Sequence, residues 1–209
     1  MILGIGIPYY KNSEECEVAF KKLMATLKWQ ITEETRLVVY EDGQVSEWLH
    51  NYAKGRITVI SNPINKGVAH ARNVILKFLQ NEGCSYMLSL DSDDMIDCDY
   101  INKMYIECIK NEYDLIESPF IVNGKEYVYF RRDNVAGCAI SMDLIGDDIF
   151  DERYNISEDT LFIHKMYDKK ELKIKRINSN YYYNFGINPN SLMKKFERSE
   201  IKLMREDLK

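Results

Sequence analysis

The sequence lacks the cysteine spacings that hold zinc or a disulfide framework. Its five cysteines are odd in number and no two form a CxxC pair. These thiols suit a reducing compartment, so we predict a cytoplasmic protein. No run reaches the roughly 18 apolar residues that a membrane helix needs. The apolar N-terminus, Met1–Ile7, has no basic lead or cleavage site, so it predicts a strand and not a signal peptide.

Three common site motifs are also missing. There is no GxxxxGK[ST] sequence, which excludes a P-loop. Gly4-Ile5-Gly6 lacks the third glycine of a dinucleotide fingerprint and lies inside an apolar run. The three histidines are scattered, and none forms a recognisable triad with a serine or cysteine. The net charge of −5 argues against a broad nucleic-acid-binding face.

The first half of the chain alternates short apolar runs with helical patterns. We predict strands at 2–7, 36–40, 56–60, 86–90 and 115–116, and helices at 13–29, at 65–79 with Asn65 as cap, and at 100–110. Strands separated by helices imply a mostly parallel sheet flanked by helices, which is an α/β fold.

The second half is less regular. We expect strands at 126–130, 135–141 and 173–177, a helix at 157–167 capped by Ser157, and a charged amphipathic helix at 190–209. The 209 residues suit one large α/β domain. We therefore predict a single domain, 1–209, with a sheet-rich first half and a smaller mixed second half.

Polar or special residues follow three of the predicted strands. They are Pro8-Tyr9, Glu41-Asp42-Gly43 and Asp91-Ser92-Asp93-Asp94. Ligands of open parallel sheets bind at the carboxyl ends of the strands. The three segments are therefore expected to meet at one ligand-binding edge.

The acidic segment 91–94 places three carboxylates within four residues. Their repulsion is relieved by a hard divalent cation, and carboxylate oxygens suit Mg²⁺ or Mn²⁺. A solvated turn explains the same residues, and the segment alone does not separate the two interpretations.

Other segments also carry a structural and a functional interpretation. Glu41-Asp42-Gly43 is either a turn or a carboxylate that accepts hydrogen bonds from a nucleobase or ribose. Lys66 and the helix N-terminus beside it favour an anion. Arg72 falls on the sheet-facing side, where it needs a carboxylate or phosphate partner. Ser157-Glu158-Asp159 starts a helix, where acidic residues ordinarily complement the dipole.

Taken in order, these segments resemble inverting glycosyltransferases of family 2, which have the GT-A fold. The matching pieces are Ile7-Pro8-Tyr9-Tyr10-Lys11-Asn12, Val38-Val39-Tyr40-Glu41-Asp42-Gly43, Asn65-Lys66-Gly67-Val68-Ala69-His70-Ala71-Arg72-Asn73, Leu90-Asp91-Ser92-Asp93-Asp94 and Ser157-Glu158-Asp159. Each piece is weak singly, but five in this order make a specific signal.

The resemblance implies a GT-A-like, Rossmann-related fold and a nucleotide-diphospho-sugar donor, usually a UDP-sugar, with Mn²⁺ or Mg²⁺ on its diphosphate. Residues 1–97 would form the nucleotide-sugar-binding half and 98–209 the acceptor-side half with a C-terminal helix. By motif position, the resemblance implies that Pro8 and Tyr9 lie beside the nucleobase, that Glu41 binds the uracil or ribose, and that Asp42 supports the turn. Arg72 would lie in the nucleotide pocket, and Asp91 and Ser92 would bind the donor. Asp93 would be the metal ligand, Asp94 would lie near the donor sugar, and Asp159 would be the general base.

The chain departs from the family pattern in places. Glu41 stands where the family usually has Asp, and Gln44 where it usually has Ser. The family's aromatic-rich acceptor motif is absent, and Tyr181-Tyr182-Tyr183 with Asn184 is a candidate to replace part of it. The acceptor hydroxyl is therefore unidentified. A nucleotidyltransferase-like enzyme and a non-catalytic sugar-nucleotide-binding module are the alternatives. The first usually has a glycine-rich basic loop where this chain has Pro8–Asn12.

Overall fold

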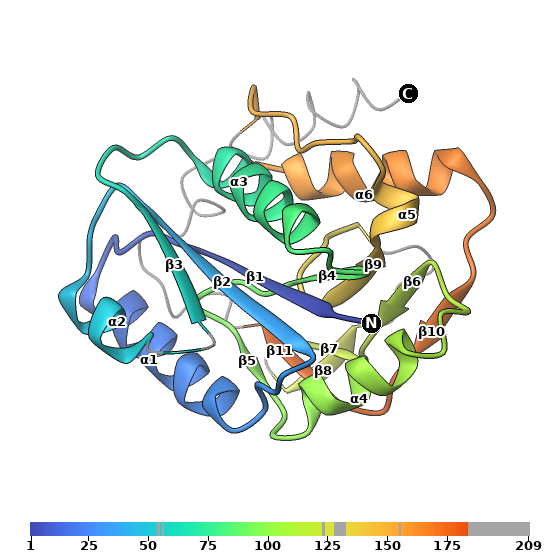
Figure 1. The fold of residues 1–209 in the computed structure, drawn as a ribbon, viewed down its shortest axis with the longest axis horizontal. Helices are drawn as coiled ribbons and strands as arrows, with labels where there is room; N and C mark the ends of the chain where they lie inside the picture. The colour runs from blue at the N-terminus through green and yellow to red at the C-terminus, as the bar shows by residue number, and fades with distance from the viewer. Residues whose placement is uncertain (54, 56, 123, 128–132, 155, 184–209) are drawn as a thin grey trace.

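The computed structural model describes residues 1–53, 55, 57–122, 124–127, 133–154 and 156–183. A seven-stranded sheet, in the order β10-β6-β9-β4-β1-β2-β3, forms its centre, and a four-stranded sheet, β5-β11-β7-β8, lies beside it (Figure 1). The elements are β1 (Leu3–Tyr9), α1 (Glu14–Lys28), β2 (Thr35–Asp42), α2 (Glu47–Tyr52), β3 (Ile57–Asn62), α3 (Val68–Asn81), β4 (Tyr86–Ser89), β5 (Met95–Ile96), α4 (Tyr100–Cys108), β6 (Leu115–Glu117), β7 (Phe120–Val122), β8 (Lys125–Tyr127), β9 (Cys138–Ser141), α5 (Met142–Ile145), α6 (Glu158–Lys169), β10 (Ile174–Arg176) and β11 (Tyr181–Tyr183).

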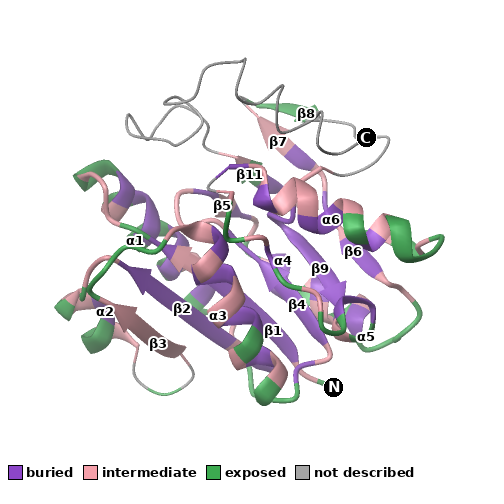
Figure 2. Cartoon of the chain, turned by 90° about the horizontal axis from the view of Figure 1, so that it is seen from above, coloured by how far each residue is buried: buried purple, intermediate pink, exposed green. Residues whose placement is uncertain are grey.

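Helices cover both faces of the large sheet. Helices α3, α5 and α6 lie over one face, and α1, α2 and α4 over the other (Figure 1). Each face has its own cluster of buried apolar side chains. Figure 2 shows the middle strands as buried and the edge strand β3 as intermediate. The burial of β1 on both faces explains its continuous apolar sequence.

The two glycines of β1 serve packing. A Cβ on Gly6 would lie 2.3 Å from Ile75 of α3, and one on Gly4 would lie 2.8 Å from Leu79. Bare glycines therefore let α3 approach β1 closely. This contact accounts for the Gly4-Ile5-Gly6 pair without a dinucleotide.

Most of the elements predicted in the first half are confirmed, with boundaries that differ by one to a few residues. Ser13 is the N-cap of α1, and its Oγ accepts from Cys16 N at 3.2 Å. The strands β1 to β4 are parallel, as the alternating pattern implies. The strand β9 runs antiparallel between β4 and β6, so the large sheet is mixed.

Several expectations about local structure were wrong or incomplete. The N-cap of α3 is Gly67 and not Asn65, because Asn65 instead accepts from Gly67 N in the preceding turn. Ser157 occupies the N-cap position of α6 but makes no capping hydrogen bond with its side chain. The short elements α2, β5, β7, α5 and β11 were not predicted. The helix expected at 190–209 lies outside the described residues.

Within the described residues, no helix combines the length and apolar character that spanning a membrane requires.

Candidate active site

The carboxyl ends of β1, β2 and β4 lie at one edge of the large sheet. Tyr9 is in register with Glu41 on the neighbouring strand. Leu90 N donates to Gly6 O at 3.0 Å, which holds the chain just before Asp91 alongside β1. The prediction that these three segments meet at one edge is therefore confirmed.

Residues 91–94 form a tight turn after β4. Asp94 N donates to Asp91 O at 3.2 Å, which closes the turn. The side chains of Ser92 and Asp93 are half-buried, whereas Asp94 is only 1% exposed. The three carboxylates therefore occupy different environments.

Arg72 of α3 is the cation that offsets this acidic turn. Its Nη2 donates to Asp91 Oδ1 at 2.8 Å, and its Nη1 donates to Glu158 at the start of α6. Arg72 is 3% exposed, and the ring of Phe150 lies 5.8 Å from its guanidinium. A cation this deeply buried needs such carboxylate partners, as the sequence predicted.

Asp159 follows Glu158 in the first turn of α6 and is partly buried. Its Oδ1 accepts from Thr160 N at 2.8 Å. Burial raises the pKa of Asp159; the Arg72 charge opposes the shift and the Asp91 charge adds to it. Burial likewise raises the pKa of Glu158. An aspartate with a raised pKa and a half-open position is suited to accept a proton.

Glu41 is fully buried and bound by its own chain. Its Oε1 accepts from Ser46 N at 2.8 Å, and its Oε2 contacts Ser61 Oγ and His50 Nε2 at 2.5 and 3.1 Å. These bonds hold the segment after β2 against β3. Contact between Glu41 and a nucleobase or ribose stays a prediction.

Asp42 binds the backbone that leads into α3. Its two carboxylate oxygens accept from Lys66 N and Gly67 N, both at 2.8 Å. The N-terminus of α3 favours a nearby anion, and the Asp42 carboxylate is that anion. This geometry matches the turn-supporting role expected of Asp42.

Two polar atoms near the end of β1 are buried, and neither makes a hydrogen bond of good geometry with a described residue. They are the Tyr9 hydroxyl and Gln44 Nε2. Gln44 is tied to the same loop, because its Oε1 accepts from Lys11 N at 2.8 Å. Pro8 lies beside them at the end of β1 and is half-buried. The Gln44 side chain also lies close enough to Tyr9 to act on its pKa, which burial raises. Buried polar groups without a well-formed hydrogen bond need an explanation, and a bound polar ligand supplies one.

Asp94 is bound by a tyrosine from the second sheet. The hydroxyl of Tyr181 donates to Asp94 Oδ2 and accepts from Asp91 N at 3.2 Å. Tyr181 is 0% exposed, so its ring packs in the core while its hydroxyl contacts the acidic turn. Tyr182 points the other way, with its hydroxyl on Asp97. Asn184 lies outside the described residues.

The carboxylates of residues 91–94 suit a metal ion that arrives bound to a ligand. Among the described residues, no group of three or more Asp, Glu, His or Cys side chains is arranged to hold an ion. Asp91 and Asp93 are both half-buried; Asp91 is paired with Arg72, and the buried Asp94 accepts from Tyr181. Mg²⁺ commonly binds through one or two carboxylates and completes its shell with substrate phosphates and water. The turn suits that mode of binding.

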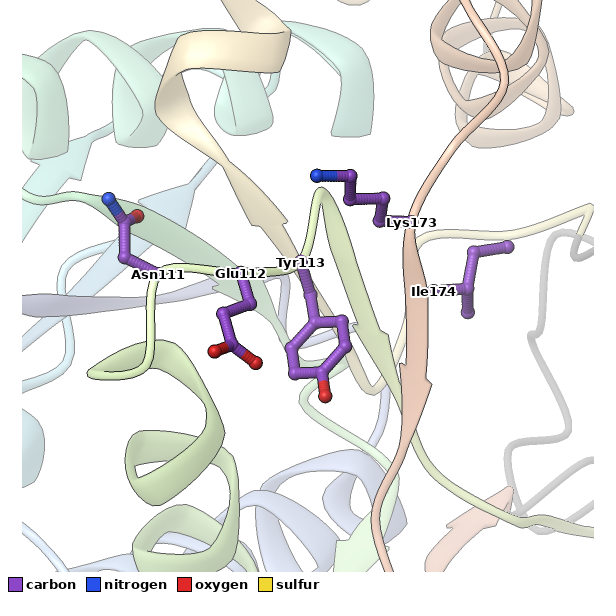
Figure 3. Close-up of a pocket in the computed structure, with 5 residues that line it drawn as sticks. All are labelled: Asn111, Glu112, Tyr113, Lys173 and Ile174. Atoms are coloured by element: carbon purple, nitrogen blue, oxygen red, sulfur yellow. The ribbon is translucent and has the colours of Figure 1, made fainter.

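A cavity of about 520 Å³ lies elsewhere, lined by Asn111, Glu112, Tyr113, Lys173 and Ile174 (Figure 3). These residues are at the amino ends of β6 and β10, which run in the same direction as β4. The cavity is therefore at the edge opposite the acidic turn.

Sequence reasoning missed several residues of this site. Glu158 adjoins the predicted base, but its pairing with Arg72 spans 86 positions and leaves no local pattern. Tyr181 was expected on the acceptor side. The one local signal for a buried side chain is that Tyr181 and Tyr183 are two positions apart and so share one face of a strand. His50, one of the three scattered histidines, is exposed and contacts Glu41.

Comparisons with known proteins agree with this fold. A model of the family described as "Glycosyl transferase family 2" matches residues 5–194. The crystal structure of S. aureus TarS 1–349 in complex with UDP-GlcNAc superposes with a TM-score of 0.74 at 20% identity, covering 94% of this chain and 62% of that one. The complex with UDP gives 0.70 at 21% identity, covering 88% and 60%. A longer TarS structure gives 0.69 at 21% identity, covering 87% and 36%.

The chain thus spans between about a third and two thirds of these TarS chains. A comparison with curated proteins gave no match. The fold is that of the GT-A class, with a mixed central sheet between helices. The chain belongs to glycosyl transferase family 2, because the family model covers most of its length.

Proposed function

We propose that this protein transfers a sugar from a nucleotide-diphospho-sugar, most simply a UDP-sugar, to an acceptor hydroxyl with inversion at the anomeric carbon. The observation that carries the proposal is the Asp91–Arg72–Glu158 chain, which joins the acidic turn to the helix that carries Asp159. In a family 2 fold, these contacts support a donor site near Asp91 and a base at Asp159, because Asp91 and the first turn of α6 bind the same buried cation. Structural neighbours were crystallised with UDP and UDP-GlcNAc, which makes these the first donors to test.

Asp159 is the proposed general base. It would take the proton of the acceptor hydroxyl as that oxygen attacks the anomeric carbon, at a hydrogen-bond distance of roughly 2.6–3.2 Å. The sugar would pass through an oxocarbenium-like state. Arg72 binds the Asp91 carboxylate and fixes its position in the acidic turn. Inversion follows because base and leaving group lie on opposite faces of the sugar.

Asp93 is the proposed ligand for Mn²⁺ or Mg²⁺ carried by the donor diphosphate. Such an ion, when bound, neutralises charge on the departing diphosphate. Pro8, Tyr9 and Gln44 form the proposed nucleobase-binding side, where the Tyr9 hydroxyl and Gln44 Nε2 are buried without a well-formed hydrogen bond. Ser92 and Asp94 complete the turn. The five free cysteines support a cytoplasmic location as part of the proposal.

The test compares Asp159→Asn with Asp168→Asn, an exposed residue near the other end of the same helix. Purified protein is incubated with UDP-GlcNAc and other UDP-sugars plus Mn²⁺, and donor hydrolysis is followed. We expect Asp159→Asn to keep UDP affinity while hydrolysis falls about 10²–10⁴-fold, and Asp168→Asn to behave as wild type.

Two results would count against the proposal. Unchanged hydrolysis by Asp159→Asn would remove that residue from the role of base. Binding of UDP-sugars by the wild type without any hydrolysis or transfer would favour the non-catalytic module instead.

A further inference from the structure

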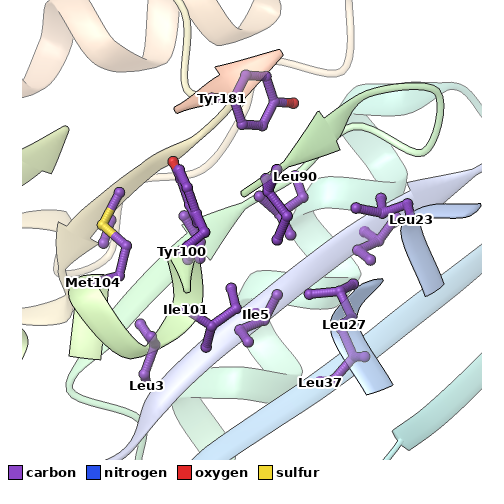
Figure 4. Close-up of a cluster of buried hydrophobic side chains, with 14 of the residues drawn as sticks. Leu3, Ile5, Leu23, Leu27, Leu37, Leu90, Tyr100, Ile101, Met104 and Tyr181 are labelled. Atoms are coloured by element: carbon purple, nitrogen blue, oxygen red, sulfur yellow. The ribbon is translucent and has the colours of Figure 1, made fainter. Parts of the chain in front are cut away.

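The acidic turn is held from the second sheet by one buried phenol. Tyr181 of β11 places its hydroxyl between Asp94 and Asp91, donating to the Asp94 carboxylate and accepting from the Asp91 amide. Tyr181 and Asp94 are 0% and 1% exposed. Figure 4 shows Tyr181 above the end of β4, near Leu90, which directly precedes the turn.

The ring of Tyr181 has little freedom to move. It stacks on Phe120 of β7 with centroids 5.4 Å apart and planes inclined by 15°. A Cβ on Gly137 would lie 2.5 Å from the ring, so only glycine fits behind it. The Gly137 carbonyl is fixed in turn by the Tyr100 hydroxyl at 2.7 Å. The position of the hydroxyl is therefore set by the core and not by solvent.

The hydrogen bond from the Tyr181 hydroxyl stabilises the buried carboxylate of Asp94. A buried carboxylate without hydrogen-bond donors is costly, and a hydroxyl that donates to a carboxylate is among the stronger donors. Burial, and then the Asp94 charge, raise the pKa of Tyr181 well above its ordinary value, so the phenol stays protonated and able to donate. The same oxygen accepts the backbone N–H of the first turn residue, so one atom fixes both ends of the turn.

We propose that Tyr181 is a positioning residue that holds the 91–94 turn in the shape needed to bind the metal-diphosphate part of the donor, acting through the Asp94 carboxylate and the Asp91 amide. The proposal rests on the donor-binding function proposed above. In this proposal, Asp94 acts by keeping the turn in shape. The strand β11, which lies in the acceptor-side half, then contributes a residue to the donor site.

The test uses the full chain with Tyr181→Phe, which keeps the stacked ring and removes only the hydroxyl. The matched control is Tyr86→Phe. Tyr86 is also buried and loses a hydroxyl hydrogen bond, to Tyr113 O, but it lies at the amino end of β4, away from the turn. Asp94→Ala removes the same contact from the other side and serves as a second variant if Tyr181→Phe does not fold.

The first measurement needs no ligand. Amide hydrogen exchange is followed by mass spectrometry over peptides that contain residues 91–94 and, separately, β2. We expect exchange at 91–94 to speed up about tenfold or more in Tyr181→Phe and Asp94→Ala, with little change in β2. Tyr86→Phe should leave 91–94 as in the wild type. Wild-type exchange at 91–94 in both site variants would overturn the proposal.

The second measurement is the affinity for UDP with Mn²⁺ and with EDTA. We expect Tyr181→Phe to weaken Mn²⁺-dependent binding about 10–100-fold and to leave binding in EDTA unchanged. Equal losses in both conditions, or no loss in either, would contradict the proposal. If the wild type itself binds no UDP with Mn²⁺, the proposed function fails, and the exchange measurement still decides whether Tyr181 holds the turn.

Discussion

Arg72 Nη2 lies 2.8 Å from Asp91 Oδ1, and the other terminal nitrogen of the same guanidinium binds Glu158. One buried cation therefore joins the acidic turn after β4 to the first turn of α6. The residue next to Glu158 is Asp159, the proposed base. Arg72 therefore helps to set the relative placement of the acidic turn and the proposed base.

Removing that cation should be costly. Arg72→Met leaves the buried Glu158 carboxylate without its partner, and we expect the free energy of unfolding to fall by about 3–5 kcal/mol. Urea denaturation with unchanged m-values measures the loss. Adding Glu158→Leu to Arg72→Met should recover part of the lost stability, because the more deeply buried of the two carboxylates is then removed and only the half-buried Asp91 lacks its partner. A double variant less stable than Arg72→Met would contradict this assignment.

Asp42 should contribute to stability independently of any nucleotide. Asp42→Ala removes the acceptor of two backbone N–H groups before α3, and we expect a loss of about 1–2 kcal/mol in unfolding free energy. Asp42→Asn keeps one acceptor oxygen and should lose less. Thermal unfolding without ligand measures both variants. An unaltered midpoint for Asp42→Ala would show that these bonds are not formed in solution.

Gly137 should be intolerant of a side chain because of Tyr181. Its φ is +66°, and a Cβ would meet the Tyr181 ring. Gly146 has a similar φ of +59° but nothing within 4 Å of an added Cβ. Gly146→Ala should therefore lose about 1 kcal/mol from backbone strain alone, and Gly137→Ala about 1–3 kcal/mol more from overpacking. Equal losses from chemical denaturation of the two variants would exclude the ring contact.

The pH dependence of donor hydrolysis should reflect Asp159. A base must be ionised to accept a proton, and burial raises the pKa of this carboxyl. The rate should therefore fall as pH drops through a value above the roughly 3.9 of an ordinary aspartate. Rates at saturating donor between pH 4 and 9 check this. A rate that stays level down to pH 4 would argue against Asp159 as the base.

The sequence predicts the fold well where the pattern is local and repeated. The apolar runs of β1, β2 and β4 and the spacing of apolar residues in α3 suffice for a mostly parallel sheet flanked by helices. The sheet-facing position of Arg72 in that spacing also predicts a buried cation that needs a carboxylate. The carboxyl-end rule then brings Tyr9, Glu41 and the acidic turn together.

The partners of these residues depend on contacts that no local pattern records. Glu158 and Tyr181 reach Arg72 and Asp94 across 86 and 87 positions of the chain. Asn65 is a good helix cap by residue type, but the carboxylate of Asp42 takes the N–H groups there. The short strands β5 and β7 have two and three residues, too few to show a periodicity.

The most direct test of the donor site is calorimetric titration of UDP into the protein in the presence of Mn²⁺, for the wild type, Asp93→Ala and Asp143→Ala, an exposed residue of α5 outside the site. We expect saturable binding by the wild type and Asp143→Ala, and an affinity about tenfold or more lower for Asp93→Ala, because one charged ligand of the ion is lost. Wild-type affinity in Asp93→Ala, or no binding of UDP to the wild type, would contradict the proposed donor site.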